Sequence, residues 1–214
     1  MRRGYVATLP SGIELEIVEC GVGEVLAANR AAGAKAGMAG GMAAAHALAR
    51  YAIRKVGGRA VTYTDLVAWP LSARDTMAAL ELVGRVHGPP DGAEKAREGV
   101  VVTTEDGRET WQLTLPSGRV AVLREASGYT LMHDILPASD AESGAPQAGE
   151  YRVGLEGLRR CLVSLDGAAP SWGPRWIEEW PLSAPETALL VGIWRDMHGL
   201  GATSSTPTLV PTTA

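Results

Sequence analysis

The sequence predicts an α+β protein made of two tandem copies of a small domain, each a β-hairpin or small antiparallel sheet followed by about three helices. Two five-residue motifs support the duplication: Thr-Leu-Pro-Ser-Gly occurs at 8–12 and 114–118, and Trp-Pro-Leu-Ser-Ala at 69–73 and 180–184. A His-Gly pair then closes each copy, at 87–88 and 198–199. Each copy is about 100 residues long, whereas stacking repeats have periods of roughly 20 to 50 residues, so each copy is expected to be a domain.

The copies are 106 residues apart at the first motif (8 to 114) and 111 apart at the second (69 to 180), so the second copy has gained residues in between. We therefore predict a first copy over 1–88, a linker over 89–99, a second copy over 100–200 and an extended C-terminal tail over 201–214. The linker is composed of Pro, Gly and charged residues. The Thr-, Ser- and Pro-rich tail is expected to be disordered in isolation, and a partner chain would be needed to hold it.

Composition and charge exclude several classes of protein. The 214 residues are 46 % hydrophobic and 21 % charged, which is typical of a globular chain. A net charge of −4 without a cluster of Lys and Arg argues against a nucleic-acid partner. We expect neither a membrane span nor a signal peptide, because no run of 18 apolar residues and no apolar segment after the first residues is present. Cys20 and Cys161 are not spaced as a C-x-x-C motif and are expected to be buried thiols of a cytosolic protein.

In the first copy, we expect strands over Tyr5–Leu9 and Ile13–Val18, since apolar residues alternate with Glu in the second of them. Pro10-Ser11-Gly12 between them predicts a three-residue hairpin turn, because Pro fixes φ near −65° and Gly accepts a positive φ. A helix over Val22–Ala32 and a glycine-rich loop over Ala34–Gly41 are expected to follow.

Apolar residues from Met42 to Val56 repeat at helical spacing, which predicts an amphipathic helix that ends at Gly57-Gly58. A short extended piece over Arg59–Tyr63 and one helical turn capped by Thr64 come next. Ser72 is the predicted N-cap of the last helix, which ends at His87.

The second copy begins with β-prone runs over Val100–Thr104 and Thr110–Leu115, and Asp106-Gly107 between them predicts a two-residue hairpin turn. This copy is therefore expected to have one strand more than the first, or a clearer version of it. The other expected elements match those of the first copy: a strand over Arg119–Arg124, a helix over Tyr129–Leu136, a polar loop over Pro137–Gly149, an amphipathic helix over Glu150–Leu165, and a helix capped by Ser183 that runs to His198.

The candidate reactive residues favour structural roles. His87 and His198 are equivalent in the two copies, and each ends a helix, so a C-terminal cap is favoured over a catalytic role. Ser11 and Ser117 lie in turns without the G-x-S-x-G motif of a nucleophile, and 37–41 lacks the spacing of a phosphate-binding loop. Trp69 and Trp180 are expected to anchor the following helix in the core.

The sequence therefore predicts no catalytic residue, no cofactor and no metal site. The residues with assigned roles are structural and belong to the repeated motifs: Pro10, Ser11, Gly12, Trp69, Pro70, Ser72, Pro116, Ser117, Gly118, Trp180, Pro181 and Ser183.

The order of these motifs resembles a known family. A Leu-Pro-Ser-Gly opening, an alternating strand, helices, a turn such as Leu165-Asp166-Gly167 and a capped helix ending at His198-Gly199 are similar to the tail assembly chaperones of bacteriophages and the baseplate hub assembly proteins of contractile-tailed phages. The resemblance covers nearly all of each copy. It implies a small α+β protein without a cofactor that contacts hub, tape-measure or tube proteins in a larger assembly, in the virion tail or in the host cytoplasm during assembly.

Such proteins usually carry one unit, so the duplication favours a non-enzymatic tail or baseplate component over a transient chaperone. Two alternatives stay open. One is a dissociable chaperone for the tape-measure or hub protein, and the other is a host cytosolic enzyme of unknown reaction. Loss of a measured turnover after replacement of His87 and His198 by Ala, with the fold intact, would favour the enzyme.

Overall fold

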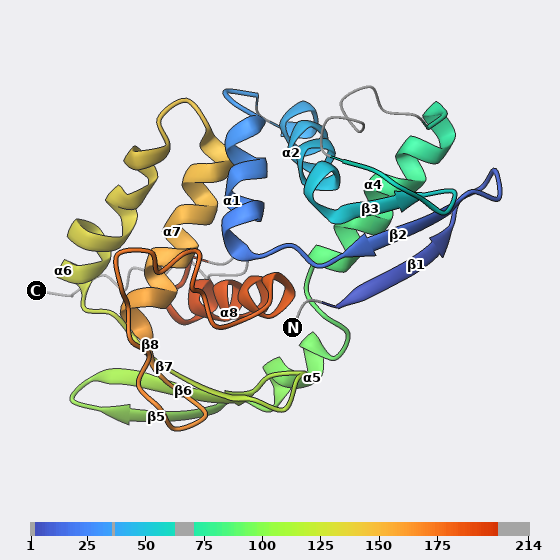
Figure 1. The fold of residues 1–214 in the computed structure, drawn as a ribbon. Helices are drawn as coiled ribbons and strands as arrows, with labels where there is room; N and C mark the ends of the chain where they lie inside the picture. The colour runs from blue at the N-terminus through green and yellow to red at the C-terminus, as the bar shows by residue number, and fades with distance from the viewer. Residues whose placement is uncertain (1–2, 36, 63–70, 201–214) are drawn as a thin grey trace, which may run out of the picture.

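The computed structural model describes residues 3–35, 37–62 and 71–200 of the chain. They form an α+β fold with two four-stranded antiparallel sheets and, in this described part, seven α-helices (Figure 1). The α+β prediction is confirmed. The order of elements differs from the expected one, because each sheet is completed by strands that follow helical segments: two segments precede the third strand of the first sheet, and four precede the last strand of the second sheet.

The first sheet contains four strands in the order β1 (Gly4–Thr8), β2 (Glu14–Val18), β3 (Ile53–Val56) and β4 (Arg59–Ala60). In β2, Leu15 and Ile17 are buried, and they alternate with two glutamates on the other face. The predicted hairpin between β1 and β2 is present. β2 shifts its register against β3 between Glu16 and Ile17.

Three described helices accompany this sheet: α1 (Val22–Ala31), α2 (Gly37–Ala52) and α4 (Ala73–His87). The predictions for α1 and α4 are confirmed. The loop predicted over 34–41 and the helix predicted over 42–56 are wrong in their bounds, because α2 already begins at Gly37 and ends at Ala52. The spacing of Ile53 and Val56 also fits a helix, but these β-branched residues complete the sheet beside β2.

The second sheet contains β5 (Val101–Glu105), β6 (Arg108–Thr114), β7 (Val120–Arg124) and β8 (Leu162–Leu165) in that order. The Asp106-Gly107 hairpin is present, with a positive φ at both residues. The second sheet does not have one strand more than the first: β5 is added at its start, but the first sheet has β4 where the second has only a bridge between Leu165 and Ala168.

The segment predicted as a linker, 89–99, contains the short helix α5 (Ala93–Glu98). Ala96 of α5 is buried in the same core as the second sheet, and Arg97 forms an ion pair with Asp196. α5 therefore packs on the second half of the chain.

The remaining helical segments are α6 (Gly128–Thr130), the π-helix η1 (Leu131–Ile135), the 3-10 helix η2 (Leu136–Glu142), α7 (Pro146–Cys161) and α8 (Ala184–Met197). The helix expected over 129–136 is thus only partly α-helical, and the polar loop expected over 137–149 is mostly helical. The helix expected over 150–165 ends at Cys161, because Leu162 and Leu165 pair with β7 as strand β8.

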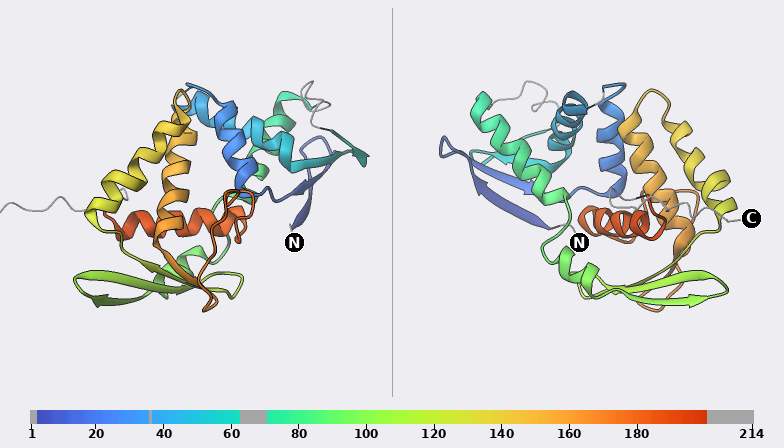
Figure 2. Two further views of the ribbon diagram at one scale, coloured as in Figure 1. Left: turned by 60° about the vertical axis from the view of Figure 1, so that its left-hand side comes forward. Right: turned by 180° about the vertical axis from the view of Figure 1, so that it is seen from behind.

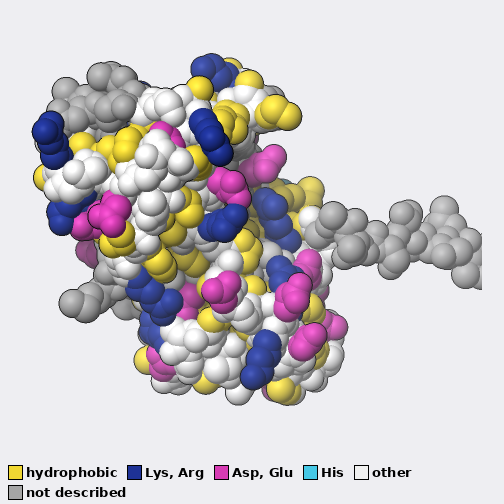
Figure 3. Space-filling view, turned by 90° about the vertical axis from the view of Figure 1, so that its right-hand side faces the viewer, with side chains coloured by type: hydrophobic (Ala, Val, Ile, Leu, Met, Phe, Trp, Pro, Cys, Tyr) yellow, Lys and Arg dark blue, Asp and Glu magenta, His cyan; other side chains and the backbone are white. Residues whose placement is uncertain are grey.

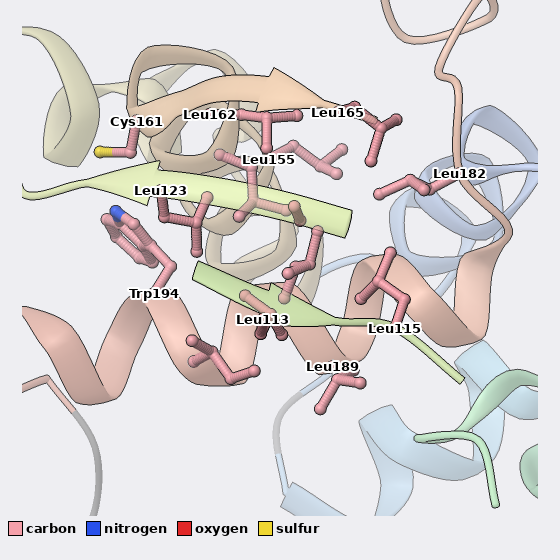
Figure 4. Packing of buried hydrophobic residues seen from close by; sticks show 14 of the residues in the cluster. Leu113, Leu115, Leu123, Leu155, Cys161, Leu162, Leu165, Leu182, Leu189 and Trp194 are labelled. Carbon is pink, nitrogen blue, oxygen red and sulfur yellow. The ribbon is translucent and has the colours of Figure 1, made fainter. Parts of the chain in front are cut away.

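The largest core lies between the second sheet, α7 and α8. Figure 4 shows leucines of β6 and β7, Leu155 of α7 and Trp194 of α8 meeting there. Smaller clusters fill the first half and the contact between α1 and α7, where Leu26 packs against Ala145 and Ala148. Val22 of α1 also belongs to the core of the second half. The contact between α1 and α7 can be followed from behind in Figure 2, so the two halves are packed on each other.

Some predicted features lie outside the described residues. These are the helical turn after Thr64, Trp69 and Pro70 of the second motif, and the tail over 201–214.

Candidate functional site

The two Pro-Ser-Gly turns have the same geometry. In the first, the N–H of Leu9 donates to the carbonyl of Ile13 at 2.8 Å, and Gly12 has a φ of 86°. In the second, the N–H of Leu115 donates to the carbonyl of Arg119 at 2.7 Å, and Gly118 has a φ of 88°. Pro10, Ser11, Pro116 and Ser117 complete these turns. A positive φ explains why glycine occupies the third position of each.

The last helix of each half starts with a serine N-cap. The Oγ of Ser72 accepts the N–H of Asp75 at 3.2 Å, and the Oγ of Ser183 accepts the N–H of Glu186 at 3.4 Å. In the first half the cap also holds the hairpin, because Asp75 Oδ1 accepts the N–H of Ser11 at 3.1 Å. The turn of the first motif is therefore connected to the helix start that follows the second motif, although 64 positions separate Ser11 from Asp75.

Trp180 lies in the core and anchors α8. Only 8 % of it is exposed, and its indole N–H donates to the Oγ1 of Thr187 at 2.8 Å. Its ring stacks on Trp172 with the ring centroids 5.0 Å apart. The carbonyl of the next residue, Pro181, accepts a hydrogen bond from Arg119 at 2.8 Å, which connects the second turn to this helix start.

The two repeated histidines each bind two backbone groups. His87 Nε2 accepts the N–H of Cys20 at 2.8 Å, and its Nδ1 lies 2.8 Å from the carbonyl of Val83. His198 Nε2 accepts the N–H of Ala126 at 2.9 Å, and its Nδ1 lies 2.8 Å from the carbonyl of Trp194. This pattern requires the neutral ring with the proton on Nδ1, since only a lone pair on Nε2 can accept an N–H.

Both nitrogens of each ring are therefore occupied by backbone groups of the chain. Burial lowers the pKa of His87, although the charges of Glu19 and Glu24 oppose this effect. The predicted capping role holds in part, because each ring donates to a carbonyl in the last turn of its helix. The ring does so as a neutral group, not as a cation at the helix dipole.

The cysteines are placed for packing. Cys161 is buried beside the indole of Trp194 (Figure 4), and burial raises the pKa of its thiol to about 11. A thiol with this pKa is protonated at neutral pH and is a poor nucleophile. Within residues 3–35, 37–62 and 71–200, no group of three His, Cys, Asp or Glu side chains is arranged to hold a metal ion.

The surface has two notable clefts, and residues of the repeated motifs line one of them. A cleft of about 500 Å³ lies on one side of the contact between the two halves. It is lined by the start of the first sheet, the loop after α4 and the start of α8. Tyr5, Glu19, Pro116 and Glu186 are among its lining residues. The face shown in Figure 3 has hydrophobic side chains gathered across its middle, with charged side chains around them. A larger cleft of about 750 Å³ lies between η2, α7 and the end of α8.

The sequence did not predict the contact that joins the halves. Arg30 of α1 donates from Nε and Nη2 to the two carboxylate oxygens of Glu142, both at 2.6 Å, and only 4 % of the Glu142 side chain is exposed. Glu142 belongs to a segment that was expected to be a polar loop. With 112 positions between the two residues, no local pattern could indicate this pair.

Comparisons of the chain with known protein families, with curated proteins and with solved structures find no match. Among the described helices, none is both long enough and apolar enough to cross a membrane.

Proposed function

We propose that the chain is a tandem duplication of one domain, and that it is a non-enzymatic structural or assembly protein of a phage tail or baseplate, or of a phage-derived contractile particle. It would act through contacts with hub, tape-measure or tube proteins. The proposed first copy covers 1–88 and the second 100–200, with α5 in the segment between them.

The strand irregularities support the duplication. The register shift of β2 falls between Glu16 and Ile17, and that of β7 falls between Val122 and Leu123, which is 106 positions later. This is also the separation of the Pro-Ser-Gly turns. A bulge is a specific feature of a fold, so its recurrence at the same separation favours a common origin of the two sheets.

The helices support it as well. α2 and α7 each have 16 residues and continue directly into a four-residue strand, β3 or β8. The two histidine contacts have the same form, and the backbone N–H groups that donate to them, at Cys20 and Ala126, are again 106 positions apart. The register shift, the junction between a long helix and a short strand, and the histidine contact thus recur in both halves.

The observation that carries the proposed function is that the repeated motifs are used inside the fold. The turns, caps, Trp180 and both histidines bind backbone groups or the core, so the conserved part of the duplication builds a scaffold. The surface of this scaffold exposes large apolar side chains that suit protein contacts. The most exposed are Val6, Met38, Val101, Tyr129 and Met132.

Quantitative mass analysis of purified tailed particles tests this function. A structural component should be present at a fixed stoichiometry with the hub or tube proteins. A dissociable chaperone should be absent from mature particles and bound to the tape-measure or hub protein in the lysate. If the chain is found neither in particles nor with these proteins, the proposed function is wrong.

A further inference from the structure

The outer edge of β1 is an open strand edge. The carbonyl of Arg3 accepts the N–H of Glu19 at 2.9 Å, and the N–H of Leu9 donates to the carbonyl of Ile13 at 2.8 Å. Hydrogen-bonded residues alternate along an antiparallel strand, so every second residue of β1 points its N–H and C=O away from β2. These residues are Gly4, Val6 and Thr8. No strand of the described part of the chain lies on that side of β1 (Figure 1).

The equivalent edge in the second sheet is covered. There β5 pairs with β6, with Val101 opposite Gln112 and Thr103 opposite Thr110. At the separation of 106 residues, Gln112 corresponds to Val6 and Thr110 to Gly4. β5 thus shows which kind of segment pairs with such an edge: an antiparallel strand rich in β-branched residues.

The core-facing side chains show what an added strand would cover. Val102 of β5 lies opposite Trp111, which is half-buried and packs on the core. Tyr5 corresponds to Trp111 and faces the core side beside Ile17, but 37 % of Tyr5 is exposed. An apolar side chain opposite Tyr5 would cover this ring as Val102 covers Trp111.

The edge also lacks the usual protection. Natural edge strands are commonly blocked by charged residues, proline or bulges. β1 has the sequence Gly-Tyr-Val-Ala-Thr, which contains neither a charge nor a proline, and Val6 is 71 % exposed on its outer face. Such an edge is an acceptor for a further strand.

We propose that the outer edge of β1 binds an extended segment of a partner protein by antiparallel strand addition. The segment has the chemistry of β5: it is largely uncharged, rich in β-branched residues, and places an apolar side chain against Tyr5. Main-chain bonds to Gly4, Val6 and Thr8 supply affinity, and the pocket beside Tyr5 supplies selectivity. The inference rests on the proposed function in two respects: it takes the two halves as copies of one domain, and it assumes that the chain has a protein partner.

The test uses the full chain and a synthetic peptide with the sequence of residues 99–106, Gly-Val-Val-Val-Thr-Thr-Glu-Asp. Amide hydrogen exchange is measured by NMR with and without the peptide. At about nine-tenths occupancy, exchange at Gly4, Val6 and Thr8 should slow roughly tenfold, while Tyr5 and Ala7, which already bond to β2, should not change. Unchanged exchange at saturating peptide would overturn the proposal.

Two variants of one residue locate the peptide. Val6→Pro removes an outward N–H but leaves the bonds of Tyr5 and Ala7 to β2, so it should fold and lose the peptide effect. Val6→Thr keeps the N–H and the β-branch and should keep the effect. Equal protection in Val6→Pro would overturn the proposal. The N–H of Gln112 faces β5, so Gln112→Pro removes a bond within the sheet. It should therefore lower the melting temperature far more than Val6→Pro.

A graft keeps the proposal testable if Val6→Pro does not fold. The sequence of residues 100–107 is placed after a new initiator Met and directly before Arg2, which corresponds to Arg108. The grafted strand should protect Gly4, Val6 and Thr8 and abolish the peptide effect. If these amides exchange as in the unmodified chain, the edge does not accept such a strand.

Sedimentation distinguishes a partner segment from a second copy of the chain. A concentration-dependent dimer that Val6→Pro abolishes and the peptide does not dissociate would assign the edge to self-association and overturn the proposal. A chain that remains monomeric and binds the peptide supports it. All these measurements use the isolated chain, so their failure leaves the particle analysis, and with it the proposed function, unaffected.

Discussion

At the scale of single residues, His87 and His198 show how a repeated residue can serve the fold. Each ring connects the end of the last helix to the residues just before the first helical segment of the same half, at Cys20 or Ala126. The sequence predicts a role at the helix end, and the bond to the carbonyl four positions earlier agrees with it. The second partner is 67 or 72 positions away, so no local pattern could identify it.

This geometry predicts that acid destabilises the protein through His87. The pKa of His87 is lowered in the folded state, so its contribution to stability is complete above the ordinary value of 6.5 and is lost as the pH falls through the lowered pKa. Protonation of Nε2 would break its bond to the N–H of Cys20. We expect the free energy of unfolding to fall by about 1 kcal/mol between about pH 7.5 and pH 5 from this residue.

Urea unfolding over this pH range measures the effect. His87→Gln should be less stable than the wild type at neutral pH and should show a flatter pH profile. His133→Gln is the matched control, because His133 is exposed, and it should keep the wild-type profile. A His87→Gln profile parallel to that of the wild type would contradict the assignment of the neutral ring.

At the scale of elements, the turns and helix starts were predictable because their signals are local. Pro-Ser-Gly, Asp106-Gly107 and the serine caps require particular residues at particular backbone angles. The ends of α2 and α7 were not predictable. Ile53 and Leu162 continue the apolar spacing of a helix, and only pairing with β2 or β7, which tertiary structure creates, places them in strands.

The packing of α7 on α8 yields a second prediction. A Cβ on Gly157 would overlap the indole of Trp194, a side chain with no exposed surface. Gly157→Ala should therefore lower the free energy of unfolding by about 1–3 kcal/mol through overpacking. Gly84→Ala is the control, because nothing lies within 4 Å of a Cβ there and Ala favours the helix. It should raise stability by roughly 0.5–1 kcal/mol.

Thermal or denaturant unfolding of both variants checks this prediction. The two substitutions are chemically identical and both lie inside helices, so helix propensity alone would change stability in the same direction. Equal stabilisation of the two variants would contradict the close approach of α7 and α8.

At the scale of the whole molecule, α1 and the pair of Arg30 and Glu142 join the two halves. Arg30 lowers the pKa of the buried Glu142 through its hydrogen bonds. The stabilisation is therefore present above the ordinary value of 4.5 and is lost as the pH falls through the lowered pKa. The docking of the halves could not be predicted from the sequence, because the motifs specify each half separately.

Removal of Arg30 should leave a buried carboxylate without its partner. We expect Arg30→Met to lower the free energy of unfolding by about 2 kcal/mol at neutral pH, less than for a fully buried pair because the Arg30 side chain is 51 % exposed. Arg85→Met removes an exposed pair with Glu81 and should change stability by less than about 0.5 kcal/mol. Equal effects in urea unfolding would show that the Arg30 contact does not hold the halves together.

The most direct test of the assembly role is the number of intact tailed particles after deletion of the coding sequence, counted by electron microscopy. The proposed function predicts that intact particles are lost, that tail-less or aberrant ones accumulate, and that the wild-type chain supplied in trans restores assembly. A normal number of intact, infectious or contractile particles without the chain would contradict it.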